Sequence, residues 1–263
     1  MTVPMTTTMT INWIGLWTMV RRELQRLWRV PIQAVVAPLI SALLFIFIFG
    51  FVVGGRIRNF GHYSYLEFVL PGVVMMNIVS ASFLQATSQI YFQRFQRSIE
   101  EILVAPLSYV EMILGSISIV VIRSVLTAIG IMLIGTAFGA VHMHSLPEFL
   151  FWVVFVSMIF GFLGIIVALW AKTFEQLNVL MVFFIQPLSM VGGVFNTIAM
   201  LPPWLRWLAY GNPLFYFING LRHSMIGFTE GPATFGAIFT VTLAAVLGTI
   251  VWRLYAIGWG LRE

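Results

Sequence analysis

The stretch that decides the fold is NTIAMLPPWLRWLAYGNPLFYFINGLRHSMIGFTEGP, residues 196–232. It is too apolar for a free loop, and Pro202, Pro203, Gly211 and Pro213 interrupt it too often for one straight helix. Backbone that is not helical survives at membrane depth only where it is buried in protein or lines a watery cavity. The stretch therefore predicts a pair of short re-entrant helices within residues 196–227.

The composition places the whole chain in a membrane. Of 263 residues, 60% are hydrophobic and only 9% are charged, against about 25% charged in soluble domains. The chain has no cysteine, which excludes a disulfide framework, thiol catalysis and a cysteine-ligated metal. The net charge of +5 is too sparse and dispersed for nucleic-acid binding and indicates topology instead.

Apolar runs of about 20 residues predict membrane-spanning helices. Six such runs cover residues 31–53, 65–92, 109–141, 146–170, 177–195 and 235–255. They leave no segment long enough for a second, soluble domain, so we expect one all-α membrane domain over residues 1–263. The start, MTVPMTTTMT, lacks the basic region of a signal peptide, and we expect no cleavage there.

Residues 11–30 precede the first run and read as an amphipathic helix. In NWIGLWTMVRRELQRLWRV, apolar residues recur at helical spacing and arginines occupy the rest of the wheel. Such a helix, with tryptophans at its apolar boundary, lies in the membrane interface. An ordinary juxtamembrane anchor without a mechanical role is the alternative.

Basic residues favour cytoplasmic loops, so their distribution predicts orientation. Eight lie on the side of the termini: Arg21, Arg22, Arg26, Arg29, Arg94, Arg97, Lys172 and Arg262. Four lie on the other side: Arg56, Arg58, Arg206 and Arg222. We expect both termini in the cytoplasm.

Motifs for catalysis are absent from the sequence. There is no H-E-x-x-H, no G-x-S-x-G and no aspartate for a Ser–His–Asp triad. The HMH at residues 142–144 reads as a polar turn better than as a metal site. Lys172, the sole lysine, follows Ala171 rather than glycine, which excludes a Walker motif. Any ATP-driven work must use another polypeptide.

Arg123 falls near the middle of the third run. A charge at that depth costs roughly 2.5–3.5 kcal/mol on insertion scales and usually faces a bundle interior or water. Structural pairing with an unknown acceptor and a place in a translocation path both remain open.

The segment QRFQRSIEEILVAPLS, residues 93–108, is charged between two apolar runs. As one helix it would place Phe95, Ile99, Ile102 and Leu103 on a single stripe, with most charges off it. Arg97 and Glu101 would form an i,i+4 pair worth about 0.2–0.5 kcal/mol. We expect the apolar face to dock on a soluble protein; a solvated turn helix is the alternative.

Five segments in this order carry a family resemblance: YLEFVLPGVVMMNIV, FQRSIEEILVAPLS, AKTFEQLN, GGVFNTIAMLPPWL and GNPLFYFINGLRHSMIG. Over residues 13–263 the chain resembles the membrane subunit of type-2 ATP-binding-cassette exporters. More narrowly it is similar to short bacterial permeases encoded apart from their ATPase, which include drug, polyketide and polysaccharide exporters. The resemblance implies a multi-pass inner-membrane protein with an interface helix, six spans, a coupling helix and an external re-entrant pair.

The resemblance also implies partners and site residues. The partners would be a second copy of the chain, membrane lipid and two copies of a separate ATPase subunit that binds ATP and Mg. No cofactor, metal or catalytic residue would belong to this chain. The matching coupling residues are Phe95, Arg97, Glu100, Glu101 and Pro106, and the matching external-gate residues are Gly192, Gly193, Pro202, Asn212, Pro213, Gly220 and Arg222.

The family does not fix the cargo. The 24 phenylalanines suit a hydrophobic or lipid-linked substrate, or plain lipid contact. Small residues of the third run (Gly115, Ser116, Gly130 and Gly135) would allow close helix approach within a homodimer bundle. Two rival functions stay open: a membrane enzyme acting on lipid or glycan, and a scaffold subunit that does not transport.

Overall fold

The computed structural model describes residues 12–29, 36–54 and 63–261, and this part of the chain is helical and contains no strand. The helices, in order, are α1 (Trp13–Arg29), α2 (Ala37–Phe47), α3 (Tyr65–Phe95), α4 (Ser98–Val104), α5 (Tyr109–Ala137), α6 (Leu146–Trp170), α7 (Phe174–Leu180), α8 (Gln186–Val191), α9 (Pro203–Tyr210), α10 (Pro213–Ile226) and α11 (Ala233–Ile257). A π-helical turn, Ile48–Val53, extends α2, another, Met181–Ile185, joins α7 to α8, and a 3₁₀ turn, Ile198–Met200, precedes α9.

Five helical segments are long and apolar enough to cross a membrane: α3, α5, α6, the continuous α7–α8 segment Phe174–Val191, and α11. They match five of the six predicted runs. The first run, 31–53, is described only from residue 36, and the apolar helix Ala37–Gly50 within it is shorter than a membrane span. The third run was drawn too long: α5 ends at Ala137, and Gly139 follows with a φ of 66°.

The beginnings of α3 and α5 are fixed by capping boxes. The Ser64 hydroxyl accepts from the Glu67 N–H at 3.2 Å, and the Glu67 carboxylate accepts from the Ser64 N–H at 2.7 Å. Ser108 and Glu111 repeat the pattern at 3.3 Å and 2.6 Å. Each box satisfies two backbone donors that a helix start leaves free. These glutamates at span ends are therefore structural.

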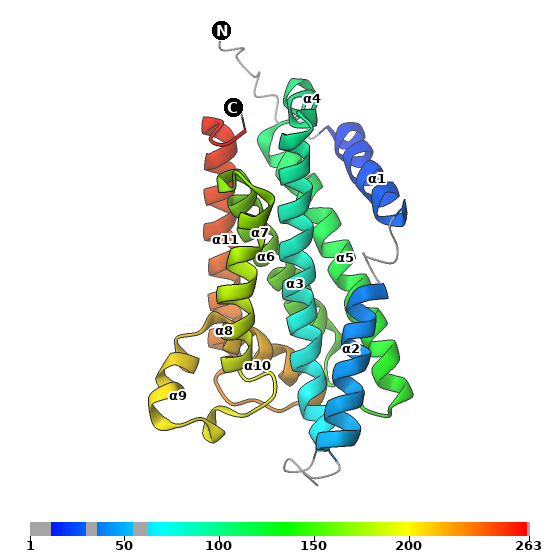
Figure 1. Ribbon diagram of the computed structural model, residues 1–263, viewed down its shortest axis with the longest axis vertical. Helices are drawn as coiled ribbons and strands as arrows, with labels where there is room; N and C mark the ends of the chain where they lie inside the picture. Colours follow the sequence, from blue (N-terminus) through cyan, green and yellow to red (C-terminus); the bar gives the residue numbers. More distant parts are fainter. Residues whose placement is uncertain (1–11, 30–35, 55–62, 262–263) are drawn as a thin grey trace.

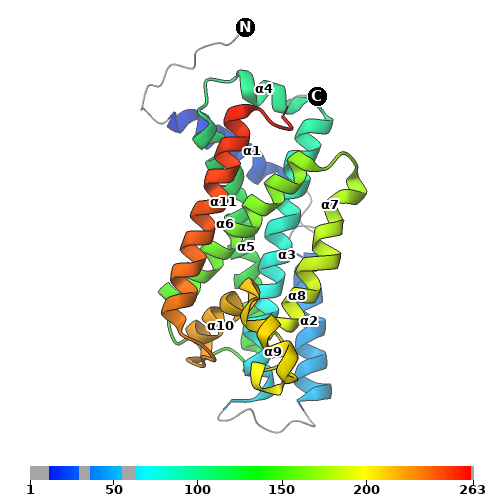
Figure 2. The same cartoon turned by 90° about the vertical axis from the view of Figure 1, so that its left-hand side faces the viewer.

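The long helix α3 is the most buried of the spans and forms the centre of the bundle. It packs most extensively on α6, α5 and α10. Figure 2 shows α11, α6 and α5 on one side of α3, and α7, α8 and α2 on the other. Along the bundle axis, α4 and α1 lie at one end and α9 and α10 near the opposite end (Figure 1). We call these the α4 end and the α9 end.

The segment predicted as an interface helix is helical: α1 lies beside α5 (Figure 1). Met19 and Val20 are buried against the bundle, and a Cβ at Gly115 of α5 would come within 2.6 Å of the Met19 sulfur. Trp13 and Trp17 point away from the protein, 69% and 64% exposed. The tryptophans thus face the surroundings of the protein, as a helix in the membrane interface requires.

The small residues of α5 allow close packing against other parts of the same chain. A Cβ at Gly130 would lie 2.6 Å from Leu39 of α2, and one at Gly135 would lie 2.9 Å from both Leu70 and Val141. Close approach in α5 is thus explained by packing against α1, α2 and α3, without a second copy of the chain.

Gly135→Leu is expected to lower the stability of the bundle by about 1–3 kcal/mol, the usual cost of overpacking. Leu70 is fully buried and cannot move aside freely. Thermal unfolding in detergent measures the effect. Gly211→Leu is the matched control, since its added Cβ would meet nothing closer than 3.6 Å. Equal melting temperatures for the two variants would contradict the packing described here.

Candidate functional site

The segment 93–108, which we call the coupling segment, is not one helix as expected. The chain leaves α3 at Phe95, reverses at Arg97 with a φ of 56°, and begins α4 at Ser98. Arg97 accepts from the Glu100 N–H at 3.2 Å, and its own N–H donates to the Arg94 carbonyl at 2.9 Å. Arg97 lies outside α4, so it and Glu101 do not share one helix, and their pairing stays a prediction because the Glu101 side chain lies outside the described part.

Phe95, Ile99 and Ile102 do not form the predicted single outward stripe. Ile99 and Ile102 are 4% and 9% exposed and belong to the core of the bundle, whereas Phe95 is 76% exposed. The reversal at Arg97 breaks the helical register that would have aligned them. The surface that α4 and its flanks present outward is instead mixed in character: Phe95, Arg97, Glu100, Val104 and Pro106. The side chains of Glu101 and Leu103 lie outside the described part.

Arg94, in the last turn of α3, connects the coupling segment to a third span. Its Nη1 donates to the carbonyl oxygens of Ala168, Leu169 and Ala171, at 2.5, 3.2 and 3.2 Å. These carbonyls stand at the end of α6, where a helix leaves acceptors unpaired. Since α5 begins soon after α4 ends, α4 is connected through the chain to α3 and α5, and Arg94 attaches the end of α3 to α6.

The helix α1 is attached near both ends of the coupling segment. Gln93 Nε2 donates to Glu23 Oε1 at 3.4 Å. At the other end, the Asn12 N–H donates to Glu111 Oε1 at 2.5 Å, and Asn12 Nδ2 donates to the Pro106 carbonyl at 3.3 Å. Sequence reasoning missed these contacts, because residues about 70 to 100 positions apart meet only in the folded bundle.

At the α9 end, Arg222 of α10 is 1% exposed and holds several elements together. Its Nε donates to the Phe68 carbonyl of α3 at 3.2 Å, and its Nη2 donates to the Gly193 carbonyl at 2.6 Å. The guanidinium also stands 3.9 Å from the centroid of the Phe68 ring, and its Nη1 lies 4.0 Å from Glu230 Oε2. We call these four residues the Arg222 cluster.

Glu230 supplies the countercharge and lies just beyond the predicted limit at 227. Its Oε1 accepts from the Ile198 N–H at 3.1 Å, and its own N–H donates to Asn219 Oδ1 at 2.8 Å. Burial raises the pKa of the Glu230 carboxyl, while Arg222 and the Ile198 N–H act in the opposite direction. One signal could have found it: an arginine on an apolar helix needs a carboxylate, and Glu230 is the next one in the sequence.

Asn212 and Pro213 begin α10. Asn212 Oδ1 accepts from the Leu214 N–H at 3.0 Å, its Nδ2 donates to the Leu188 carbonyl at 2.5 Å, and Pro213 takes the first helical position. Gly192 lies beside this cap, since its added Cβ would stand 3.2 Å from Asn212 Nδ2. The predicted residues Gly192, Asn212 and Pro213 therefore join the end of α8 to the start of α10.

The remaining predicted residues have distinct places. Gly193 has a φ of 92°, a left-handed conformation that favours glycine. Gly220 lets α10 approach α6, because a Cβ there would come within 2.1 Å of the Trp152 ring. Pro202 caps the beginning of α9 and, among the described contacts, takes no part in the Arg222 cluster.

The sequence profile of the ABC-2 type transporters matches residues 15–226, from α1 through the end of α10, and so includes both the coupling segment and Arg222. The chain belongs to the ABC-2 type transporter family. It is 32% identical over 257 residues to the inner membrane transport permease YadH of Escherichia coli K12, covering 97% of this chain and all of that protein. It is 24% identical over 222 residues to nodulation protein J of Rhizobium leguminosarum biovar trifolii, covering 82% of each.

Family membership makes the chain a permease subunit of an ATP-binding-cassette transporter rather than an enzyme. The inner-membrane relative and the apolar helices make it a multi-pass protein of the inner membrane. Membership also implies an ATP-binding-cassette partner.

Within the spans of this permease, Arg123 has a hydrogen-bond acceptor that could not be identified from the sequence. Its Nη1 donates to Gln85 Oε1 of α3 at 2.5 Å, and the side chain is half-buried. One position along, the hydroxyls of Ser124 and Ser82 lie 2.7 Å apart. These two pairs join α3 to α5 near the middle of the bundle and favour the pairing alternative for Arg123.

The three histidines within the described ranges, His142, His144 and His223, lie at the α9 end. His223 Nδ1 lies 2.9 Å from Glu148 Oε1, which ties α10 to the first turn of α6. His142 Nδ1 lies 3.4 Å from Glu67, and the His144 N–H donates to the Ser224 carbonyl at 3.1 Å. No group of three His, Cys, Asp or Glu side chains within the described ranges could hold a metal ion. HMH lies in a turn between α5 and α6, as its sequence indicated.

Proposed function

We propose that this permease is the membrane half of an exporter that moves a hydrophobic or lipid-linked cargo out of the cytoplasm or the inner leaflet. A separate ATPase subunit would bind ATP and Mg and supply the work. The observation that carries the proposal is the construction of α4. Its inner side is anchored by Ile99 and Ile102, and its outer side exposes both an apolar and a charged side chain, Val104 and Glu100.

The coupling proposal follows from how α4 is attached. A short helix fixed to α3, to α5 and, through Arg94, to α6 moves as one body with three spans. An ATPase that grips the exposed side of α4 would thus rearrange the spans when it closes on ATP, without any chemistry in this chain. The α4 end is then cytoplasmic, in agreement with the greater number of basic residues expected there.

A homodimer with the path between two protomers is the second part of the proposal. The face formed by α2 and α7–α8 exposes the amides Asn178 and Gln186 and the rings of Phe183 and Phe184, which are 70% and 56% exposed. Exposed amides within a span are costly in lipid. This face therefore suits a partner copy or a path for an amphipathic cargo better than lipid.

Copurification tests the proposal. An affinity-tagged permease, purified from the cells in which it occurs, should bring down a separate ATP-binding-cassette ATPase in a complex of two permeases and two ATPases. Vesicles containing the complex should transport in an ATP-dependent way. Stoichiometry by native mass spectrometry decides the pairing. A complex of one permease with two ATPases would contradict the proposed homodimer. A permease that binds no ATPase would contradict its assignment as an exporter subunit.

For residues 196–227 we propose an external gate that dips into the outer leaflet and bars backflow. The Arg222 cluster fixes α10 to the bundle, whereas α9 presents Trp204 and Trp207 outward, 72% and 83% exposed. Large exposed indoles at the end of a membrane bundle favour contact with lipid or with a partner copy.

Cysteine labelling in intact cells distinguishes a buried gate from an exposed loop. We expect Trp204→Cys and Tyr210→Cys to resist bulky impermeant maleimides, because lipid or the partner copy covers them, and to lose transport when small methanethiosulfonates react. The chain has no cysteine of its own, so each variant carries a single thiol. Complete labelling of both sites by the bulky reagent would indicate an ordinary exposed loop.

A further inference from the structure

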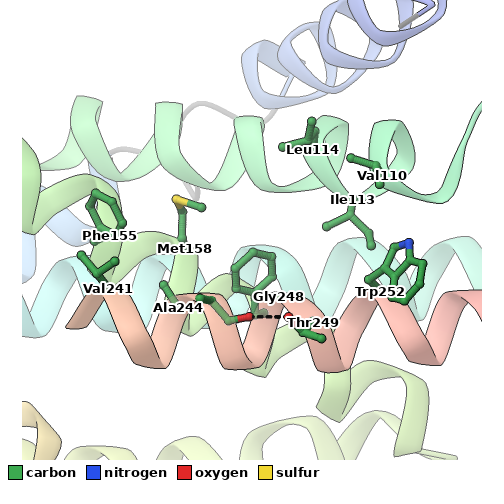
Figure 3. A pocket seen from close by; sticks show the side chains of 12 residues that line it. Val110, Ile113, Leu114, Phe155, Met158, Val241, Ala244, Gly248, Thr249 and Trp252 are labelled. Atoms are coloured by element: carbon green, nitrogen blue, oxygen red, sulfur yellow. Dashed lines mark hydrogen bonds between the residues drawn. The ribbon is translucent and has the colours of Figure 1, made fainter. Parts of the chain in front are cut away.

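A groove of about 430 Å³ lies between α5, α6 and α11, on the side of α3 opposite to α2 and α7–α8 (Figures 2 and 3). Figure 3 shows Phe155 and Val241 at one end of it and Val110 and Trp252 at the other. Val110 and Trp252 stand close to the α4 end of their helices. We propose that this groove binds one acyl chain of a membrane phospholipid from the leaflet at the α4 end.

The length of the groove fits one leaflet. Val241 and Trp252 are eleven positions apart on α11, which is about 16 Å along a helix axis. Half of the hydrocarbon core of a bilayer is about 15 Å thick. A chain that enters beside Trp252 and ends near Val241 therefore spans the leaflet without crossing the midplane.

The only polar side-chain groups that line the groove are the Trp252 indole N–H, at its mouth, and the hydroxyl of one threonine. Thr249 is the only hydroxyl among its lining residues, and it donates to the Ala245 carbonyl of its own helix at 2.8 Å (Figure 3). Outside the lining but on the same helices, Thr242 and Ser118 donate to the carbonyls one turn earlier, at 2.8 Å and 2.6 Å. Polar groups satisfied in this way are compatible with lipid, so a hydrocarbon chain is the ligand that fits.

The mouth of the groove fits a phospholipid headgroup. Trp252 is 45% exposed, and aromatic rings of this kind mark the level of the headgroups. Arg253 follows it, is exposed, and has no hydrogen bond or ion pair to any residue that the structure describes. A free guanidinium beside an acyl-chain groove is complementary to a lipid phosphate.

A second copy of the chain and a cargo lipid are both less suited to the groove than a membrane phospholipid. The exposed amides that would suit a partner copy, Asn178 and Gln186, lie on the other side of α3. A cargo lipid is expected at the same side as those amides, where the proposed path runs. The groove proposal itself needs only the bilayer around the permease and does not depend on the path.

The test is photo-cross-linking of the full-length permease reconstituted in liposomes with phosphatidylglycerol that carries a diazirine near the end of one chain. Mass spectrometry should map the adducts to α6 and α11 around Phe155 and Val241, where the chain ends. Ala245→Trp fills the groove and should reduce these adducts about tenfold, a change equivalent to about 1.4 kcal/mol. Val246→Trp, one position further on α11 and outside the lining, is the control and should label as the wild type does.

A second probe tests the headgroup. Diacylglycerol with the same diazirine lacks the phosphate, so Arg253→Gln should reduce adducts from phosphatidylglycerol and leave those from diacylglycerol unchanged. Three results would overturn the proposal: wild-type adducts spread evenly over all lipid-facing helices, adducts concentrated on α2 and α7–α8, or a disulfide-linked dimer formed by Ala245→Cys. The first result means ordinary boundary lipid, the second a cargo route, and the third a groove between two copies.

Discussion

Replacing Arg222 with methionine is expected to destabilise the permease by about 3–5 kcal/mol and to abolish transport, because it leaves a buried carboxylate without its countercharge. Arg222 is 1% exposed, and its loss would free the Phe68 and Gly193 carbonyls as well as Glu230. The helix α10 would then lose its hydrogen bond to α3. Unfolding in detergent and transport in vesicles measure the two effects.

Arg206→Met is the matched control for this prediction. Arg206 also donates to two backbone carbonyls, those of Ala199 and Leu201, but it is exposed and water can replace it. We expect a loss of about 1 kcal/mol or less, in the range of an ordinary hydrogen bond. The double variant Arg222→Met with Glu230→Leu should recover part of the stability, since no buried charge remains. Equal destabilisation by Arg222→Met and Arg206→Met would contradict the stabilising role assigned to the Arg222 cluster.

Much of the architecture could be predicted from the sequence because membrane helices carry strong local signals. Apolar length located the helices α3, α5, α6, α7–α8 and α11, and the prolines of residues 196–232 indicated the two short helices α9 and α10. Ser64-x-x-Glu67 and Ser108-x-x-Glu111 are capping signals that could also have placed the beginnings of α3 and α5. Each of these signals acts over a few residues.

The site was less predictable because its contacts are not local. The stripe Phe95, Ile99 and Ile102 assumed a continuous helix, and a single left-handed residue, Arg97, changed which side faces the protein. The partners Gln85 for Arg123 and Phe68 for Arg222 lie far away in the sequence. A pattern on one helix wheel shows that a group needs a partner but not which helix supplies it.

Reversing the charge at Glu100 and Glu101 to arginine is expected to abolish ATPase binding and transport, with insertion and dimerisation unchanged. Glu100 is exposed on α4, so its replacement leaves the core intact. Like charge where the ATPase expects carboxylate can cost several kcal/mol across an interface, which weakens binding by about a hundredfold or more. Affinity for the purified ATPase and ATP-dependent transport are the measurements.

Glu175→Arg controls for the change in net charge. Glu175 is an exposed glutamate in the first turn of α7, in the predicted cytoplasmic connection between the fourth and fifth runs. If the ATPase recognises α4 specifically, this variant should keep most of its binding. Loss of binding in both variants to the same degree would indicate long-range attraction to the membrane subunit, with no specific docking of α4.

Site-specific cross-linking between α4 and the ATPase tests the central claim most directly. Val104 is 86% exposed on α4, and Trp207 is 83% exposed on α9 near the opposite end of the bundle. In this cysteine-free chain, Val104→Cys should cross-link to the copurified ATPase through a short bifunctional maleimide, and Trp207→Cys should not. An ATPase that is bound yet never cross-links to Val104→Cys, or cross-links equally to both positions, would contradict the assignment of α4 as the coupling helix.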